Sequence, residues 1–352
     1  MKVAIVLFNL GGPDSPEAVR PFLRNLFNDA AIIGAPTPVR WLLAHWISFR
    51  RAPIARKIYA HLGGKSPLLE LTEQQARALE NQFQGDDDVR AFIAMRYWHP
   101  MSDETVKKVK EFAPDRIVLL PLYPQFSTTT TGSSLADWRR AAQQAGLNVP
   151  TAAICCYPDE PGFINAVAGY MAGSLAEASQ TGKPRVLFSA HGLPKKIIDG
   201  GDPYAQHVEM TAAAIVEQLA IVDLDWSVCY QSRVGPLEWI GPATEDEIAR
   251  AAKDKVPVVV VPIAFVSEHS ETLVELDIEY RELAESLGVP AYHRVATVCI
   301  QENFIGGLKK MVDQALMTIK KGDNGETVAI SSSKGRRICL PAGTKCPHCQ
   351  GD

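Results

Sequence analysis

A buried strand that changes into an acidic helix within two residues constrains the fold more than any other part of this sequence. Residues 256–266 form an apolar run, which predicts a strand buried on both faces. Ser267 then predicts a helix start, and glutamates follow at spacings of three, four and four residues on one helix face: Glu268, Glu271, Glu275 and Glu279. A buried strand leading straight into a helix is typical of parallel α/β sheets, whose ligands bind at the carboxyl ends of the strands.

The acidic face itself has two interpretations. Like charges at these spacings repel, so the helix gains nothing from them unless a cation lies beside it. One interpretation is a solvated acidic face near a helix N-terminus. The other is a path for a divalent cation, because carboxylate oxygens and the nearby imidazole of His269 are suitable ligands at a strand end.

Composition and charge place the chain among soluble globular enzymes. The length of 352 residues suffices for two domains, and 46% of residues are hydrophobic and 22% charged. With 36 basic and 40 acidic residues the net charge is −4, which gives no argument for nucleic-acid binding. The longest apolar run contains two prolines and is too short to span a membrane. No signal-peptide pattern is present and the seven cysteines predict no disulfide framework, so we expect a cytoplasmic protein.

Apolar runs alternate with helical patterns along the chain, which predicts parallel βαβ units. Eight strands are expected, at residues 3–7, 90–95, 116–122, 151–155, 185–189, 226–230, 257–263 and 291–295. Each half opens with a strand that ends in a Gly/Pro turn, first at Gly11-Gly12-Pro13 and later at Gly192-Leu193-Pro194. We therefore predict an α/β fold with two similar Rossmann-like, doubly wound parallel domains, 1–159 and 160–319, facing each other across a cleft. Residues 320–352 form a C-terminal extension.

The second half carries the sharper chemistry. His191 directly follows a predicted strand and precedes a Gly/Pro turn, where an imidazole can accept a proton or bind a metal near neutral pH. A histidine packed in the core is the alternative. After the next strand, Arg233 can hold a carboxylate in a bidentate manner, and Trp239 adds an aromatic face.

Residues 31–69 contain no acid but combine cations with aromatic side chains. These are Arg40, Arg50, Arg51, Arg56, Lys57 and Lys65, with Trp41, Trp46, Phe49 and Tyr59. One interpretation is an amphipathic helix packed on its own domain. The other, slightly favoured by the lack of acids, is an apolar lip rimmed with cations. Such a lip suits a flat hydrophobic ligand that bears carboxylates, or an anionic lipid surface.

The C-terminal extension predicts a linker followed by a metal site. Residues 320–337 are polar and typical of a linker. Beyond them, three cysteines at a cytoplasmic C-terminus indicate metal ligands, for which zinc is the general occupant: Cys339, Cys346 and Cys349. A fourth thiolate would come from Cys155 or Cys156, which end a predicted strand. Adjacent strand residues point to opposite faces, so only one of the pair would be a ligand. Cys229 and Cys299 are expected to be buried apolar residues.

Together these segments resemble the ferrochelatase family. The matching stretches run in one order from residue 3 to about residue 310, and include residues 9–13, 64–68, 95–97, 123–127, 189–194, 201–204, 230–232, 235–236 and the acidic helix. The resemblance implies the paired Rossmann-like architecture. It also implies an enzyme, a lyase, that inserts Fe²⁺ into protoporphyrin IX to make protohaem in the last step of haem biosynthesis. A chelatase for coproporphyrin or another metal, and a tetrapyrrole carrier without catalysis, are the alternatives.

The resemblance also implies roles for individual residues. His191 and Glu271 match the catalytic pair. Substrate iron is expected to meet both of them and also Glu268, His269 and Glu275, with Glu279 further along a helix that is partly a π-helix in the family. The porphyrin positions are Leu10, Arg96, Tyr97, Tyr123, Ser127 and Trp239, and residues 41–59 match a membrane-facing lip.

A cofactor follows from the same resemblance. Some members carry a C-terminal 2Fe–2S cluster on three tail cysteines and one body cysteine, which favours iron over zinc for Cys339, Cys346 and Cys349 with Cys155 or Cys156. In animal members the body ligand lies in a loop that matches Ser127–Gly132, and this loop has no cysteine here. The expected partners are protoporphyrin IX and ferrous iron, with no nucleic acid. The choices between monomer and homodimer, and between a free enzyme and one on the inner face of the cell membrane, stay open.

Overall fold

The structure, a computed structural model, describes residues 1–85, 87–319 and 327–330. Within these residues the chain forms two compact units. Unit 1 comprises Met1–Cys156 together with residues from Leu308 onward, and unit 2 comprises Tyr157–Gly307. The division falls inside helix α11 (Glu302–Thr318), so residues 308–319, which the sequence placed in the second domain, belong to unit 1.

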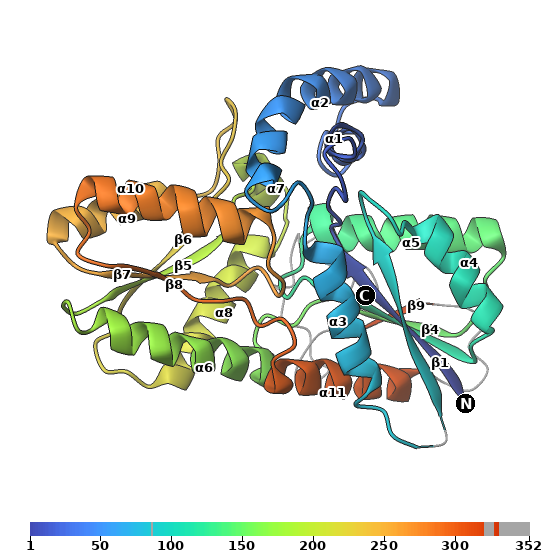
Figure 1. Cartoon of the computed structure of the whole chain (residues 1–352). Helices are drawn as coiled ribbons and strands as arrows, with labels where there is room; N and C mark the ends of the chain where they lie inside the picture. Colours follow the sequence, from blue (N-terminus) through green and yellow to red (C-terminus); the bar gives the residue numbers. More distant parts are fainter. Residues whose placement is uncertain (86, 320–326, 331–352) are drawn as a thin grey trace. The chain divides into compact units, whose positions relative to one another are not determined.

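Unit 1 is built on a parallel sheet that, among the described residues, has five strands in the order β2-β1-β3-β4-β9 (Figure 1). Side chains alternate along β1, so Ala4, Val6 and Phe8 pack against α4 and α5, whereas Asn9 bonds to Thr72 of α3 on the other face. The strands are β1 (Lys2–Asn9), β2 (Asp88–Met95), β3 (Arg116–Pro121), β4 (Thr151–Ile154) and β9 (Thr327–Ile330). The helices before α11 are α1 (Val19–Phe27), α2 (Thr37–Ala60), α3 (Leu68–Glu80), α4 (Ser102–Phe112), the π-helix η1 (Thr128–Gly132) and α5 (Ser133–Ala145).

Strand β9 corrects one prediction. Thr327–Ile330 lies inside the segment that the sequence assigned to a linker, and it pairs in parallel with β4 over four residues. A four-residue strand within a polar stretch shows no clear period in the sequence. Its position depends on an open edge of β4, which only the folded sheet provides.

Unit 2 is built on a parallel sheet in which the described strands have the order β6-β5-β7-β8. Leu187, Val258 and Val260 pack against Ile248 of α9 and Ala284 of α10, and Figure 1 shows α6 and α8 on the other face. The strands are β5 (Arg185–His191), β6 (Asp225–Gln231), β7 (Val258–Pro262) and β8 (Tyr292–Arg294). The helices are α6 (Pro161–Ala178), α7 (Lys195–Asp199), α8 (Tyr204–Leu219), α9 (Thr244–Asp254), the π-helix η2 (Glu271–Glu279) and α10 (Tyr280–Leu287).

The two sheets share one topology. Counted from the start of its unit, each has the order 2-1-3-4, and in sheet 1 β9 adds a further strand beside β4. Each of the eight predicted strands overlaps an observed one, and the predicted α/β class with two Rossmann-like sheets is confirmed. In this order the second strand lies on one side of the first strand, and the third and fourth strands lie on the other side. The strand order therefore reverses between the first and third strands, and ligands of such sheets bind outside the carboxyl ends of the strands at that point. In unit 2 this point lies between the ends of β5 and β7.

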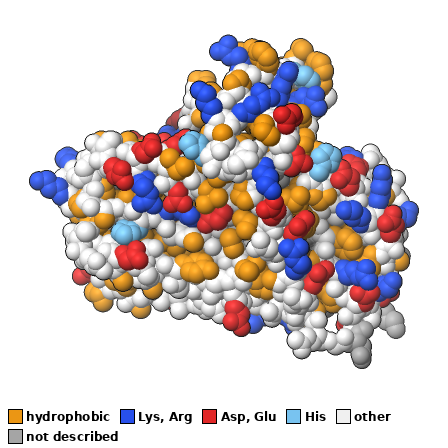
Figure 2. Space-filling model, in the orientation of Figure 1, with side chains coloured by type: hydrophobic (Ala, Val, Ile, Leu, Met, Phe, Trp, Pro, Cys, Tyr) orange, Lys and Arg blue, Asp and Glu red, His pale blue; other side chains and the backbone are white. Residues whose placement is uncertain are grey.

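Among the described helices, none combines the length and the apolar character needed to cross a bilayer. The longest, α2, buries only a narrow stripe of mostly small residues against its own unit: Ala44, Ser48, Ala52 and Tyr59. Its other faces expose large apolar side chains (Figure 2).

Candidate active site

The candidate site in unit 2 begins at the switch point of the sheet. His191 is the last residue of β5 and lies in register with Gln231, the last residue of β6. Strand β7 ends at Pro262, and the chain then leads through a loop to η2. The parallel register therefore brings the ends of β5 and β6 to one edge of the sheet, and η2 starts beside them.

His191 and Glu271 form a direct pair. Nδ1 of His191 donates to Oε2 of Glu271 at 2.9 Å, and the two side chains are 39% and 27% exposed. Burial alone would lower the pKa of His191, but the Glu271 carboxylate outweighs it and the pKa lies above the ordinary imidazole value. Burial would likewise raise the pKa of Glu271, yet the contact with His191 holds it at about 2. Near neutral pH, Glu271 is therefore ionised and orients the imidazole.

His269 differs from His191 in which ring nitrogen carries the proton. Its Nδ1 accepts a hydrogen bond from the backbone N–H of Glu271 at 3.2 Å, so this nitrogen carries no proton. Burial lowers the pKa of His269 despite the neighbouring carboxylates. The ring packs edge-on against Phe265, with centroids 4.5 Å apart. His269 is thus a neutral imidazole that carries its proton on Nε2 and caps the start of η2. The helix start predicted at Ser267 is wrong, because η2 begins at Glu271 and this cap comes from a side chain two residues before it.

Glu275 lies one turn further along η2 and is held by four donors. Oε1 accepts from the backbone N–H of Ser232 at 2.8 Å and from the Tyr280 hydroxyl at 3.2 Å. Oε2 accepts from Ser232 Oγ at 2.5 Å and from Gln231 Nε2 at 3.1 Å. Burial and repulsion from Glu271 raise the pKa of Glu275, while the bonds from Ser232 act in the opposite direction. The carboxylate is fixed in orientation beside, but apart from, the His191 contact.

Gln231 and Ser232 contact the acids of the candidate site, and the sequence reasoning gave them no role. Ser189 Oγ donates to Oε1 of Gln231 at 2.9 Å, which leaves the amide nitrogen to donate to Glu275 and to the carbonyl oxygen of Glu271 at 3.2 Å. Gln231 is fully buried and therefore links the sheet to both acids. Its place directly after the strand predicted at residues 226–230 was the available signal.

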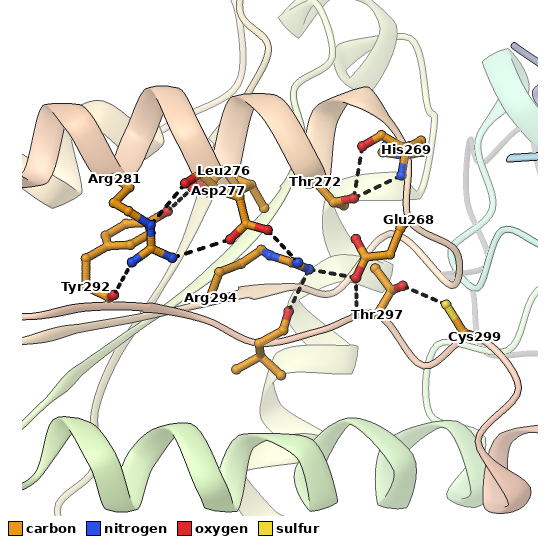
Figure 3. A network of polar contacts seen from close by, with 11 residues as sticks. Glu268, His269, Thr272, Leu276, Asp277, Arg281, Tyr292, Arg294, Thr297 and Cys299 are labelled. Atoms are coloured by element: carbon orange, nitrogen blue, oxygen red, sulfur yellow. Dashed lines mark hydrogen bonds and ion pairs between the residues drawn. The ribbon is translucent and has the colours of Figure 1, made fainter. Parts of the chain in front are cut away.

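Glu268 does not belong to this group. Its Oε1 accepts from Nη1 of Arg294 at 2.7 Å and from the backbone N–H of Thr297 at 3.0 Å (Figure 3). The cation beside this part of the predicted acidic face is therefore a guanidinium. Glu279, at the end of η2, is exposed. Among the residues that the structure describes, no group of three or more His, Cys, Asp or Glu side chains is arranged to hold a metal ion.

Trp239 is the predicted porphyrin residue that lies near His191 in unit 2. Its backbone bridges to Pro194, and a Cβ added to Gly192 would come within 3.4 Å of the indole and 2.9 Å of the carbonyl oxygen of Gln231. Glycine at position 192 therefore allows the indole to approach the turn that follows β5.

Arg96 in unit 1 is held by a buried acid. Its Nη2 lies 2.9 Å from Oδ2 of Asp29, and its Nε donates to Ser133 Oγ at 2.6 Å. Asp29 Oδ2 also accepts from the hydroxyl groups of Tyr97, at 2.8 Å, and of Ser133. The guanidinium is thus fixed in direction with 20% of its side chain exposed.

The comparisons with known proteins identify the family. The family described as Ferrochelatase matches residues 2–316. A ferrochelatase of Caulobacter vibrioides is 52% identical over 353 residues, which cover 99% of this chain and 98% of the relative. The ferrochelatase of a Wolbachia strain is 54% identical over 87% of this chain and 96% of the relative, and that of Rickettsia bellii is 50% identical over 98% and 94%.

The chain belongs to the ferrochelatase family. This membership confirms the family and the enzyme predicted from the sequence. Among solved structures, SirB from Bacillus subtilis with Fe³⁺ has a TM-score of 0.53 at 10% identity, covering 93% of this chain and all of SirB. A sirohydrochlorin chelatase SirB in complex with cobalt has a TM-score of 0.52 at 11% identity. These two similarities show the fold alone.

Two of the predicted porphyrin positions, Tyr97 and Ser127, are buried in this structure. Tyr97 has no exposed surface and packs with Val19 and Phe22 of α1. Ser127 is also fully buried, and its Oγ accepts from the backbone N–H of Thr129 at the start of η1. Neither side chain is accessible to a ligand in this conformation, whereas Arg96 is. Leu10 and Tyr123 are partly buried and pack against the cores of unit 1.

Of the cysteines predicted to hold a metal or a cluster, Cys155 and Cys156 are among the described residues. Cys339, Cys346 and Cys349 lie outside the described residues. Cys155 and Cys156 are buried thiols that follow β4, and their Sγ atoms lie 3.3 Å apart. The expectation that they point to opposite faces is therefore wrong, because the strand ends at Ile154 and its alternation no longer applies.

Proposed function

We propose that this member of the ferrochelatase family inserts Fe²⁺ into protoporphyrin IX and releases protohaem, the last step of haem biosynthesis. Iron insertion into a porphyrin follows from the family, and the observation that supports the roles of individual residues is the His191–Glu271 pair at the switch point of sheet 2. Coproporphyrin as the substrate, another metal, and a carrier without catalysis are the competing functions.

Metal insertion must remove two pyrrole protons, strip water from the iron and buckle the macrocycle so that nitrogen lone pairs face the metal. Because Nδ1 of His191 donates to Glu271, the neutral imidazole has its lone pair on Nε2. We assign Nε2 as the base that takes a pyrrole proton, and Glu271 as the carboxylate that orients the ring and stabilises the imidazolium. Glu271 and Glu275 are the carboxylates near this base that could assist the arriving iron, whereas the one lone pair of His269 already accepts from the backbone of Glu271. Leu10, Arg96, Tyr123 and Trp239 are the proposed porphyrin contacts.

The function is tested with purified protein under anaerobic conditions. Ferrous iron is supplied with protoporphyrin IX or coproporphyrin III, and the metalloporphyrin spectrum is followed over many turnovers. We expect protohaem formation with the higher kcat/KM for protoporphyrin IX. Faster turnover of coproporphyrin would transfer the assignment to the competing substrate, and binding without turnover would make the chain a carrier. Parallel assays with Zn²⁺ and Co²⁺ define the metal.

We further propose that α2 places this cytoplasmic enzyme on the inner face of the cell membrane. Five apolar side chains of α2 are more than half exposed: Trp41, Leu42, Trp46, Phe49 and Ile54. Figure 2 shows this orange surface interspersed with blue cations. Exposed apolar side chains beside cations suit the interface of an anionic bilayer.

Variants that remove positive charges from α2 test this proposal. Arg56 donates to the carbonyl oxygen of Pro16 and Arg51 stacks on Phe27, so the exposed Arg50 and Lys57 are the better choices. At about 1 kcal/mol per charge, Arg50→Gln with Lys57→Gln should weaken binding to phosphatidylserine vesicles roughly 30-fold in sedimentation assays. Lys107→Gln with Lys108→Gln on α4 is the matched control. Wild-type protein that never sediments with these vesicles would contradict the proposal.

We also propose a 2Fe–2S cluster on Cys339, Cys346, Cys349 and one of Cys155 and Cys156. Thiolates suit iron–sulfur clusters or zinc, and the family resemblance favours iron. The two body thiols are buried neighbours at 3.3 Å and are not joined in a disulfide, so either could serve.

Single serine substitutions should identify the body ligand. Anaerobically purified protein should show cluster absorption, and one of Cys155→Ser and Cys156→Ser should abolish it while the other spares it. Cys229→Ser, another buried thiol, is the control and should keep the colour. A colourless wild-type protein that contains zinc and no iron would refute the cluster and leave the chelatase assignment in place.

A further inference from the structure

The π-helical form of η2 requires stabilisation from outside the helix. It runs for nine residues, Glu271–Glu279, whereas most π-helices are single turns inside α-helices and many of those lie at functional sites. On the side of His191, the support comes from Gln231 and Ser232, which bond to Glu271 and Glu275. Further contacts come from residues of strand β8 (Figure 3).

Arg294, the last residue of β8, binds an acid at each end of this stretch. Its Nη1 donates to Oε1 of Glu268 at 2.7 Å, and its Nη2 lies 2.6 Å from Oδ2 of Asp277. The Arg294 side chain is only 10% exposed, so water screens both contacts weakly. Glu271 and Glu275 lie between the two acids in sequence. One guanidinium therefore bridges the segment that carries both site carboxylates.

A second contact from β8 reaches the helix backbone. The Tyr292 hydroxyl donates to the carbonyl oxygen of Leu276 at 2.7 Å. Arg281 in turn donates to the carbonyl oxygen of Tyr292 at 2.9 Å and to that of Asp277 at 3.0 Å. Arg281 thus reaches the C-terminal part of η2, whereas Arg294 alone among these residues also contacts Glu268.

We propose that Arg294 is a positioning residue that keeps η2 in π-helical register, so that Glu271 reaches His191 while Glu275 stays on Ser232. Its effect on turnover rests on the proposed function. A π-helix turns less per residue than an α-helix, so relaxation to the α form would rotate Glu271 relative to Glu275 and break one set of bonds. Without Arg294, the carboxylate of Glu268, only 15% exposed, would lose its guanidinium partner, whereas Asp277 would keep Arg281 at 3.5 Å.

The test compares Arg294→Met with Arg281→Met. For Arg294→Met we expect kcat to fall at least about tenfold with the Kd for protoporphyrin IX unchanged, because the base loses its oriented partner. Hydrogen exchange by mass spectrometry on the substrate-free enzyme should show faster exchange of residues 271–279. Arg281→Met keeps the bridge to Glu268 and should stay within about threefold of wild-type kcat. Unchanged exchange in Arg294→Met would overturn the proposal, and so would wild-type kcat in this variant while Glu271→Gln is impaired.

Two further variants test the same role if Arg294→Met does not fold. The triple variant Glu268→Gln, Asp277→Asn, Arg294→Met leaves no buried charge unpaired, because Arg281, which loses its contact with Asp277, is 40% exposed. It should fold but keep the kcat defect. If the triple variant recovers wild-type kcat, Arg294 only neutralises charge and the positioning role is refuted. Arg294→Lys keeps the charge without the two-pronged geometry and should restore folding but not full kcat.

The exchange experiment separates this inference from the proposed function. If Glu271→Gln keeps wild-type turnover, the catalytic roles assigned above are wrong. Exchange of residues 271–279 in Arg294→Met is measured without substrate, and it decides the positioning role in either case.

Discussion

His191→Ala should lower kcat for iron insertion by at least about 100-fold, the usual contribution of a positioned general base. In the described structure the imidazole ends β5 and donates to Glu271, and His269, the nearest other histidine, is committed to capping η2. Water or Glu271 would have to accept the pyrrole proton instead. Single-turnover formation of protohaem, followed by its absorption spectrum, measures the loss directly.

His293→Ala is the matched control. His293 lies on β8 of the same unit and pairs with Glu177 at 3.3 Å on the surface, so its removal should change kcat by less than about twofold. Porphyrin binding by fluorescence quenching should be unchanged in both variants. If His191→Ala kept more than about a tenth of wild-type turnover, a loss of roughly 1.4 kcal/mol, the assignment of the base would be wrong.

The same pair should leave a pH signature in stability. The raised pKa of His191 stabilises the fold at pH values below the ordinary 6.5, and this contribution disappears as the pH rises through the folded value. The pKa of Glu271, lowered to about 2, stabilises above the ordinary 4.5 and is lost as the pH falls toward 2. The difference in Tm between wild type and His191→Ala should therefore be largest between pH 4.5 and 6.5.

Glu271→Gln should lower kcat on the order of 100-fold and leave the Kd for porphyrin unchanged. The amide keeps the shape of the side chain but removes the charge that favours the imidazolium. The pKa of His191 should fall as a result, because the carboxylate is what raises it. Since the neutral imidazole is the base, the acid limb of the kcat–pH profile should move to lower pH than in wild type.

Glu275→Gln is the informative comparison because this acid does not touch His191. It is one turn further along η2 and held by Ser232, Gln231 and Tyr280, so we expect mainly a higher KM for iron, with kcat and the pH profile near wild type. Iron kinetics beside porphyrin titrations separate the two variants. Equal effects of both substitutions on kcat and on the KM for iron would refute a graded role for the two acids.

Local sequence signals were sufficient to predict the sheets, and they pointed to a candidate site at a strand end. Apolar runs bounded by Gly/Pro turns located eight strands, because burial on both faces leaves few alternatives for such runs. His191 was recognisable because it ends a strand before a Gly/Pro turn, which is where parallel sheets place their ligands. Strand β9 was missed because four residues carry no period, and the start of η2 was misplaced because its cap is an imidazole.

The sequence by itself determined the paired α/β sheets, the family and the stretch that bears the acids, since each is encoded in residues close together along the chain. Only the tertiary structure decided which partner each acid contacts. Glu268, Glu271 and Glu275 are alike in sequence, but they meet Arg294, His191 and Ser232 respectively, and those partners arrive from three different strand ends. Strand pairing sets these encounters, and the charge and pKa of a carboxylate depend on the partner that it meets within a few ångströms.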